Sequence, residues 1–190
     1  MKLDNIIDFI RGDQDCIENL EKISTIHMYT KHYLLVAEEL SEDSVAFLQP
    51  LKEHRDAYDH LMRVFYVPYN ETLIGGSREN LESYVKDNIQ KAVGHEYRSF
   101  YDTADWLTFI CRKWVREQLG YRGIRSRYEN KYGKEDLQTA KDFINGLPFQ
   151  IAEYRDGKDV GKRDAALKGI ENYKETLEKL IELYRKIQAL

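Results

Sequence analysis

The 190-residue sequence has few residues that interrupt regular structure and few that form covalent links. It contains three prolines, eleven glycines and two cysteines. Because proline and glycine, which often end helices and strands, are few, we expect long secondary-structure elements. The cysteines, Cys16 and Cys111, have no metal-ligand spacing. We therefore expect both to be reduced and buried, as in a cytoplasmic protein.

Long apolar runs are also missing. No stretch approaches the roughly 20 apolar residues that a membrane helix needs, so we expect no membrane association. The first dozen residues carry acids and no apolar core, which predicts no signal peptide. What the chain has is 42% hydrophobic and 33% charged residues, a balance typical of a folded soluble protein. The net charge of −4 argues against a protein that coats nucleic acid with a basic surface, but allows a local basic patch.

Apolar residues recur at steps of three and four along most of the chain, which is the helical period. No alternating pattern long enough for a strand is present. We expect an all-α protein, an antiparallel bundle of long helices. Pro50 should kink its helix or mark a late start, and Pro148 should interrupt another. The expected helices cover residues 3–11, a longer stretch capped by Asp13 or Asp15 and reaching Leu40, and residues 41–66, 80–119, 135–146 and 161–188. A short helical piece is expected to continue after Pro148 to Tyr154.

The last expected helix carries a heptad pattern. Its seam consists of Ala166, Ile170, Tyr173, Leu177, Leu180, Tyr184 and Ile187. The seam either docks on the protein's own bundle or meets a protein partner. We favour the first, and expect one domain with a bundle core over residues 1–154 and the C-terminal helix over 155–190.

Two expected helices carry polar stripes. On the first, at about 100° per residue, one face is apolar and should be buried: Phe47, Leu51, Tyr58, Met62 and Phe65. Arg55 and Asp59 flank that face, and a polar row lies further round: Asp56, His60 and Arg63. Three pairs on this helix are four residues apart and should interact: Arg55 with Asp59, Asp56 with His60, and Asp59 with Arg63.

The second stripe is His95, Arg98, Asp102 and Asp105. In an antiparallel pair, Arg55 and Arg63 would face Asp102 and Asp105, and Arg98 would face Asp56 or Asp59. One interpretation is a structural ion network that sets the helix register. The other is a cleft in which clustered His, Arg and Asp carry perturbed pKa values.

The segment from Arg55 to His60 reads Arg, a polar residue, three further residues and His. It resembles the signature of the HEPN superfamily, all-α proteins of which many are metal-independent ribonucleases in toxin–antitoxin, CRISPR and anti-phage systems. The resemblance implies a homodimer whose two motifs meet in a cleft. Arg55 would polarise the scissile phosphate, His60 would act as general acid or base, and Asp56 would orient its neighbours. Other members of the superfamily bind nucleotides or partners without catalysis.

Residues 121–134 form the one strongly basic segment, which we expect to be a loop. It could hold RNA or a nucleotide through Arg122, Arg125, Arg127 and Lys131, with Tyr121, Tyr128 and Tyr132 for stacking. The sequence thus leaves three functions open: a ribonuclease, a partner-binding subunit and a phosphate sensor.

No cofactor is expected, and no metal site. His27 and His32 are five residues apart and do not share a helix face. Asp56 with His60 is too small a ligand set, and no Glu-x-x-His pair occurs.

Overall fold

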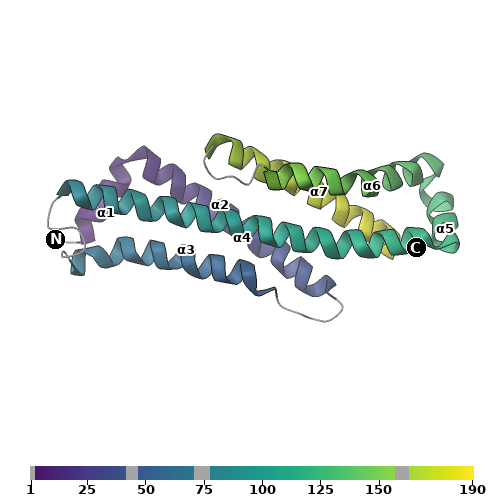
Figure 1. The fold of residues 1–190 in the computed structure, drawn as a ribbon, viewed down its shortest axis with the longest axis horizontal. Helices are drawn as coiled ribbons and strands as arrows, with labels where there is room; N and C mark the ends of the chain where they lie inside the picture. The colour runs from purple at the N-terminus through teal and green to yellow at the C-terminus, as the bar shows by residue number, and fades with distance from the viewer. Residues whose placement is uncertain (1–2, 42–46, 71–77, 157–162) are drawn as a thin grey trace. The chain divides into compact units, whose positions relative to one another are not determined.

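The computed structural model describes residues 3–41, 47–70, 78–156 and 163–190. These residues form seven α-helices, one 3-10 turn (Val67–Tyr69) and no strand (Figure 1), so the all-α prediction is confirmed. Among them, none of the helices has the length and apolar character needed to cross a membrane. The helices are α1 (Leu3–Gly12), α2 (Gln14–Leu40), α3 (Leu48–Tyr66), α4 (Arg78–Gly120), α5 (Arg122–Tyr132), α6 (Lys134–Asp156) and α7 (Arg163–Gln188).

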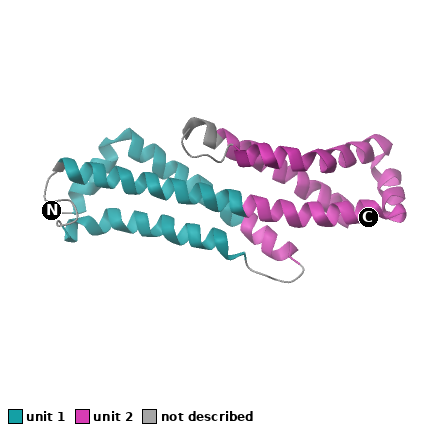
Figure 2. Cartoon of the chain, in the orientation of Figure 1, with its two compact units in different colours: residues 1–32, 47–102 teal, residues 33–46, 103–190 magenta. Residues whose placement is uncertain are grey.

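The chain divides into two compact units (Figure 2). Unit 1 comprises Met1–His32 and Phe47–Asp102, and unit 2 comprises Tyr33–Ala46 and Thr103–Leu190. Helices α2 and α4 each contribute to both units. The boundary expected between residues 154 and 155 is not one of the points of division, and the single domain stays a prediction.

Unit 1 is built around the antiparallel pair α3 and α4. Ser99 Oγ donates to the main-chain oxygen of Pro50 at one end of the contact, and His60 meets Asn88 at the other. Residue numbers therefore rise along α3 as they fall along α4, which confirms the antiparallel arrangement. The apolar core of the unit consists of Ile6, Cys16, Ile23, Ala57, Val64, Val67, Leu81, Val85, Ile89 and Ala92.

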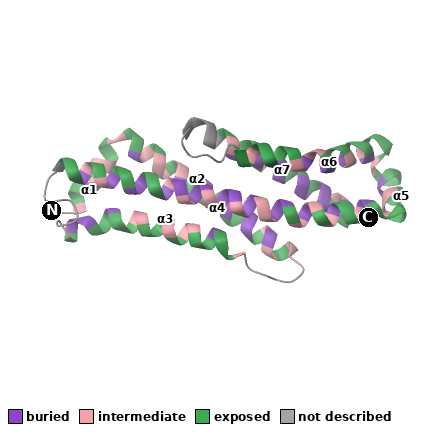
Figure 3. Cartoon of the chain, viewed as in Figure 1, coloured by how far each residue is buried: buried purple, intermediate pink, exposed green. Residues whose placement is uncertain are grey.

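The structure decides between the two alternatives for Pro50 in favour of a late start, and it corrects the predicted buried face of α3. The helix starts late, at Leu48, so that Pro50 lies in the first turn, where its missing N–H is not needed; residues 42–46 lie outside the described part. The buried face is also different from the predicted one. Its buried residues are Pro50, Ala57 and Val64, and much of the rest of α3 is exposed (Figure 3). Of the residues predicted to be buried, Phe47 is half-buried, and four are exposed: Leu51 by 42%, Tyr58 by 62%, Met62 by 39% and Phe65 by 40%.

The physical reason lies in the facing helix α4. Ala57 is completely buried beside it, and a small residue lets two helix backbones approach closely. The polar side chains of His54 and His60 lie about one turn before and after Ala57. They can be partly buried because each has a hydrogen-bonding partner on α4. The larger apolar residues of α3 are left on the opposite side.

In unit 2, the heptad seam of α7 is buried as predicted. Ile170, Tyr173, Leu177, Leu180 and Ile187 are at most 3% exposed. Aromatic contacts join the seam to the rest of the unit, with ring centroids 4.1 Å apart for Trp114 and Tyr184 and 4.9 Å for Tyr154 and Tyr173. The described part of the seam, from Ile170 to Ile187, is thus buried inside the unit. The side chain of Ala166 lies outside the described residues.

Two further expectations in unit 2 were wrong. The basic segment is not a loop, because most of it forms α5. Pro148 does not interrupt α6, which continues to Asp156. Although proline removes one helical hydrogen bond, the buried residues Ile144, Leu147 and Ile151 hold the helix against the unit on both sides of Pro148.

Candidate functional site

In unit 1, the dipeptide Glu53-His54 on α3 lies against the dipeptide His95-Glu96 on α4. Glu53 contacts His95, and His54 contacts Glu96. His95 Nδ1 lies 2.8 Å from Glu53 Oε2, and His54 Nδ1 lies 3.0 Å from Glu96 Oε1. The antiparallel register sets the two dipeptides opposite each other, and each contributes one imidazole and one carboxylate. We call this group, with His60, Asn88 and Arg98, the histidine cluster.

Glu53 is the centre of one half of the cluster. Its Oε2 also accepts a hydrogen bond from Arg98 Nε at 2.9 Å. Burial acts to raise the pKa of Glu53, but the hydrogen bonds from His95 and Arg98 outweigh it and lower the pKa below its ordinary value of 4.5. Glu53 is therefore a carboxylate at neutral pH, and it holds both neighbours in place.

Glu53 and Arg98 compete for the same nitrogen of His95. Arg98 Nη2 lies 2.7 Å from His95 Nδ1, and a guanidinium can only donate. One ring nitrogen cannot satisfy both neighbours. We assign a hydrogen to Nδ1, donated to Glu53, because a carboxylate is the stronger partner for an N–H group. This leaves Nε2 of His95 for other partners.

His60 is oriented in a similar way. Its Nδ1 lies 2.9 Å from Asn88 Oδ1, while Asn88 Nδ2 donates to the main-chain oxygen of Tyr84 at 2.9 Å. Since the Asn88 amide nitrogen is already the donor, its oxygen is the acceptor, and His60 carries its hydrogen on Nδ1. The ring stacks on His95, with centroids 5.3 Å apart and planes 25° apart. Two imidazoles thus lie side by side.

Arg55 and Asp56 lie beside this pair of rings. Arg55 donates to Asp56 Oδ1 from Nε at 3.0 Å and from Nη2 at 2.8 Å. The hydrogen bond from Arg55 lowers the pKa of Asp56 below its usual range, and the charges of His95 and His60 add to the effect. Asp56 is thus within electrostatic range of both imidazoles, and the three residues that the HEPN resemblance singles out are near one another.

The predicted charge pairs between the stripes were mostly wrong. Arg63 pairs with Asp59 on its own helix, at 2.6 Å, as the four-residue spacing predicts. Arg98 pairs with Glu53 rather than with Asp56 or Asp59. Glu53 precedes the stripe that we read from the sequence, and it supplies the carboxylate that Arg98 needs.

Asp105 belongs to unit 2 and has different partners. It accepts from Tyr173 Oη at 2.7 Å and from Arg155 Nε at 2.9 Å. It does not pair with the arginines of α3, as the spacing had suggested. Asp102, at the end of the α4 portion of unit 1, is half-buried.

A third histidine joins the other half of the cluster. His27 on α2 has its Nδ1 3.4 Å from Glu96 Oε1, and its ring centroid lies 4.7 Å from that of His54. Glu53, His54, Asn88 and Glu96 were not among the residues predicted from the sequence, and His27 was not expected to bind a metal. The reciprocal order of Glu53-His54 and His95-Glu96 on two antiparallel helices is a signal that could have found Glu53, His54 and Glu96.

The basic residues of α5 bind main-chain oxygens at helix ends. Arg125 Nη1 donates to Leu119 and Gly120 at 2.9 and 2.7 Å, which caps α4. Lys131 Nζ donates to Ala189 at 2.9 Å, and Arg127 Nη1 lies 3.4 Å from the oxygen of Leu190. These contacts give the basic residues a structural role. Phosphate binding by these residues and by the exposed Arg122 stays a prediction.

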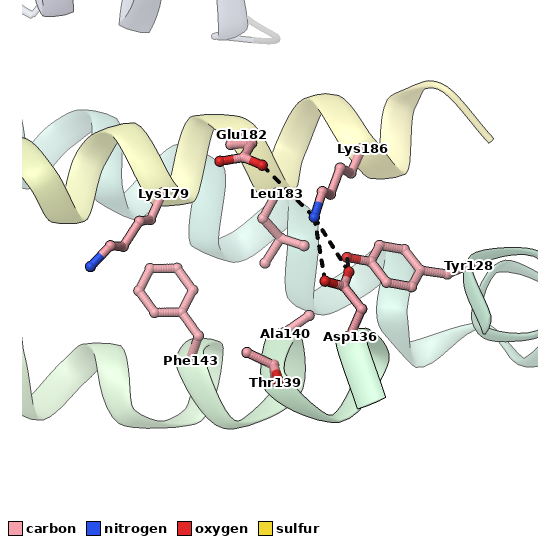
Figure 4. Close-up of a pocket in the computed structure, with 9 residues that line it drawn as sticks. All are labelled: Tyr128, Asp136, Thr139, Ala140, Phe143, Lys179, Glu182, Leu183 and Lys186. Atoms are coloured by element: carbon pink, nitrogen blue, oxygen red, sulfur yellow. Dashed lines mark hydrogen bonds and ion pairs between the residues drawn. The ribbon is translucent and has the colours of Figure 1, made fainter. Parts of the chain in front are cut away.

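One of the three tyrosines predicted to stack on a base is not accessible. Tyr128 is 1% exposed and donates its hydroxyl to Asp136 Oδ2 at 2.6 Å. Beside it lies a cavity of about 360 Å³ (Figure 4). The amine of Lys186 lies near Asp136 and Glu182 there, and Lys179 points to the other end of the cavity. With two acids around Lys186, the cavity is poorly suited to an anion.

Neither cysteine is activated as a nucleophile. Both are buried, as predicted. Burial raises the pKa of Cys111 to about 12, and burial together with Asp13 raises that of Cys16 to about 11. At neutral pH both are thiols, so the histidine cluster is the better candidate for chemistry.

The comparisons with known proteins do not assign this site, because no family model, no curated protein and no solved structure matches the chain.

The lowered pKa of Glu53 makes a prediction for acid stability. Because the pKa in the folded state lies below 4.5, Glu53 stabilises the fold above the unfolded value and loses that contribution as the pH falls through the folded pKa. We expect Glu53→Gln to lower the free energy of unfolding at pH 7 by about 1.5–3 kcal/mol, the range for hydrogen bonds to a charged group. Below about pH 4 the difference from the wild-type chain should shrink.

Urea unfolding across this pH range measures the difference. The matched control is Glu21→Gln, a change at an exposed position on α2, which should leave the curve unchanged. A loss of stability in Glu53→Gln that is the same at every pH would contradict the assignment.

Proposed function

We propose that this chain is a cytoplasmic endoribonuclease that cleaves RNA with His60 and His95 as its proton-transfer pair. The observation that carries the proposal is the stacked arrangement of the two rings, each with Nδ1 held by a polar partner and Nε2 left to react. Imidazoles transfer protons near neutral pH, and a cleavage reaction needs one group that takes a proton and one that gives it.

The reaction would proceed by internal transfer. One imidazole takes the proton of the ribose 2′-hydroxyl, and the 2′-oxygen forms a bond to phosphorus. The P–O5′ bond breaks, and the other imidazole gives its proton to the leaving 5′-oxygen. The products are a 2′,3′-cyclic phosphate and a free 5′-hydroxyl. Arg98 contacts His95 and can balance the negative charge that grows on the phosphate oxygens. The resemblance gives Arg55, which pairs with Asp56, the same role.

The motif from Arg55 to His60 supports placing the enzyme among HEPN-like ribonucleases, and hence in a bacterial toxin or anti-phage defence system. His60 and Arg55 have in this proposal the roles that the resemblance implies. His95, Glu53 and Arg98 are additions from the structure, since they are not part of the superfamily signature.

Cleavage assays of the wild-type protein on an RNA and on two matched control substrates test the reaction. We expect cleavage of an RNA oligonucleotide in the presence of a chelator, with a 2′,3′-cyclic phosphate detected by mass spectrometry. A DNA of the same sequence should stay intact because it lacks the 2′-hydroxyl. An RNA methylated at every 2′-oxygen should also resist. Cleavage of DNA, or a product with a 3′-hydroxyl, would exclude this mechanism.

We also propose that the enzyme is a homodimer, formed through the exposed apolar face of α3. Its side chains follow the alternating three- and four-residue steps of a coiled-coil seam. These positions are 39–74% exposed. The apolar residues in this row are Leu48, Leu51, Tyr58, Met62, Phe65 and Tyr69, and Arg55 lies among them.

A second copy of α3 fits this face in an antiparallel arrangement. If a two-fold axis sets Arg55 of one copy against Tyr58 of the other, the guanidinium can lie on the phenol ring. The same register sets Leu51 against Met62. It also sets Lys52 of each copy against Asp59 of the other, so the edges of the seam carry opposite charges. The two Arg55 side chains would then approach the axis, as the resemblance to a two-motif cleft implies.

Charge exchange tests the dimer. Lys52→Asp places like charges at both edges and should weaken self-association about 10-fold, while the double variant Lys52→Asp with Asp59→Lys should restore it. Tyr58→Glu in the seam should give monomers at concentrations where the wild-type chain is dimeric. Light scattering over a dilution series measures each case. A wild-type chain that stays monomeric at all concentrations would exclude the dimer without affecting the RNA result.

A second candidate function has one observation in its favour. Glu53 binds both His95 and Arg98 within unit 1, which is also how a purely structural ion network is built. In that case the chain would be a non-catalytic protein that binds a protein partner or a nucleotide. His95→Ala would then lower the melting temperature, and the wild-type chain would cleave no RNA.

A further inference from the structure

Three helices of unit 1 bring two imidazoles and one carboxylate to a single point. His27 comes from α2, His54 from α3 and Glu96 from α4. One ligand atom from each residue can be chosen so that all three lie within 4.8 Å of one another. The carboxylate is 5% exposed and His54 is 15% exposed, whereas His27 is 46% exposed and opens the group to solvent.

Glu96 is incompletely satisfied by its protein neighbours. His54 Nδ1 lies 3.0 Å from both carboxylate oxygens, but one N–H can point at only one of them. Hydrogen-bond geometry is met at Oε1, and Oε2 is buried without a hydrogen-bond partner. A buried carboxylate is costly unless a positive charge or further donors compensate it. The site therefore has room for one more positive partner.

The spacing of the donor atoms fits a small metal ion. Two ligands of a tetrahedral zinc ion, at about 2.0–2.2 Å from the metal, lie about 3.3–3.6 Å from each other. Glu96 Oε1 lies 3.0 Å from His54 Nδ1 and 3.4 Å from His27 Nδ1. Small rotations of the side chains would bring the set to this spacing.

We propose that His27, His54 and Glu96 bind one Zn²⁺ ion, with water at the fourth position on the exposed side of His27. Proteins often bind zinc through two imidazoles and a carboxylate, whereas Mg²⁺ and Ca²⁺ bind more weakly to imidazole because they prefer oxygen ligands. The ion compensates the charge of Glu96 and ties α2 to the α3–α4 pair. Its role is structural, and the proposal does not depend on the ribonuclease activity.

Binding and stability of the full chain test the site. We expect one Zn²⁺ per chain by calorimetry, and a Co²⁺ derivative with the intense visible bands of a tetrahedral site. Free Zn²⁺ at 100 times its dissociation constant should shift the unfolding equilibrium about 100-fold toward the folded state. Mg²⁺ should have no such effect.

Variants at His27 give the most informative comparison, because this side chain is the most exposed of the three proposed ligands. His27→Ala should weaken Zn²⁺ binding at least about 10-fold. His27→Cys should restore it, with a thiolate-to-cobalt charge-transfer band in the near ultraviolet that only a metal ligand produces. His32→Ala, also on α2 and exposed, is the control and should bind like the wild-type chain.

Three results would overturn the proposal: no saturable Zn²⁺ binding, equal binding in His27→Ala and the wild-type chain, or a Co²⁺ spectrum of His27→Cys without the thiolate band. Glu96→Gln adds a check that is independent of His27. If it folds, it should bind Zn²⁺ more weakly than the wild-type chain. RNA cleavage is measured separately in chelator, so loss of one property does not imply loss of the other.

Discussion

His60→Ala should lower the rate of RNA cleavage at least about 100-fold, the lower end of the range for losing a positioned general acid or base. His60 is held by Asn88 and stacked on His95, so its ring is oriented before substrate arrives. Without the imidazole of His60, the 2′-hydroxyl or the leaving 5′-oxygen of the RNA has no group to take or give its proton.

His95→Ala should have an effect of similar size, and the double variant should be little worse than either single variant. Two groups that act in one step lose most of their benefit when either is removed. Arg55→Ala should also lower the rate strongly, because the guanidinium would no longer balance charge on the phosphate. If the chain is a toxin, expression of the wild-type chain should arrest growth, and each of these changes should relieve the arrest.

The matched control is His32→Ala, which removes an imidazole from an exposed position of the same unit that has no role in the proposed reaction. It should cleave RNA at the wild-type rate. Circular dichroism and melting curves separate chemistry from folding, since a catalytic role requires lost activity with a preserved fold. Undiminished cleavage in both His60→Ala and His95→Ala would refute the assignment of the pair.

Asp105→Ala should be the most destabilising single polar substitution in unit 2, with a loss of about 3 kcal/mol. Tyr173 is completely buried and donates its hydroxyl to Asp105 at 2.7 Å. Burial, together with the nearby carboxylate, raises the pKa of Tyr173, so the group is a neutral donor. Without Asp105, that hydroxyl loses a charge-assisted hydrogen bond in an apolar environment, which costs about 1–3 kcal/mol. One polar contact between α4 and α7 is lost as well, while the aromatic contact of Trp114 with Tyr184 remains.

Substitutions of the two partners of Asp105, Tyr173 and Arg155, should differ in how much they lower the free energy of unfolding. Tyr173→Phe keeps the ring and removes the donor, and should cost about 1–2 kcal/mol. Arg155→Ala should cost under about 1 kcal/mol, because Arg155 is 57% exposed and its ion pair is screened by solvent.

A double-mutant cycle tests whether the first pair is coupled. In urea unfolding, Asp105→Ala combined with Tyr173→Phe should be less destabilising than the sum of the two single changes. Strict additivity would mean that the hydroxyl and the carboxylate do not stabilise each other.

The fold class and the long elements were accessible from the sequence because they depend on local periodicity. The row from Ile170 to Ile187 repeats at helical spacing, and those residues are buried in α7. Gly120 ends α4 as expected. Such patterns need no knowledge of the neighbouring helices, since the period of the helix alone decides which residues share a face.

The candidate site was accessible only in part. Arg55, Asp56 and His60 were found from a short motif, and His95 and Arg98 from their spacing. Their partners were not, because Glu53 precedes the stripe and Asn88 lies elsewhere on α4. The choice of the buried face of α3 failed for a related reason. Counting large apolar residues points to Tyr58 and Met62, whereas the helix packs through Ala57 and its polar neighbours.

The sequence by itself determined that this chain forms long helices, and that two of them carry matching polar residues. Only the tertiary structure decided which side of each helix is inside and which residues meet. His27, His54 and Glu96 are far apart in the chain, and no spacing rule relates them. They come together because three helices pack in one register, and that register is set by side-chain packing between elements rather than by any pattern within one of them.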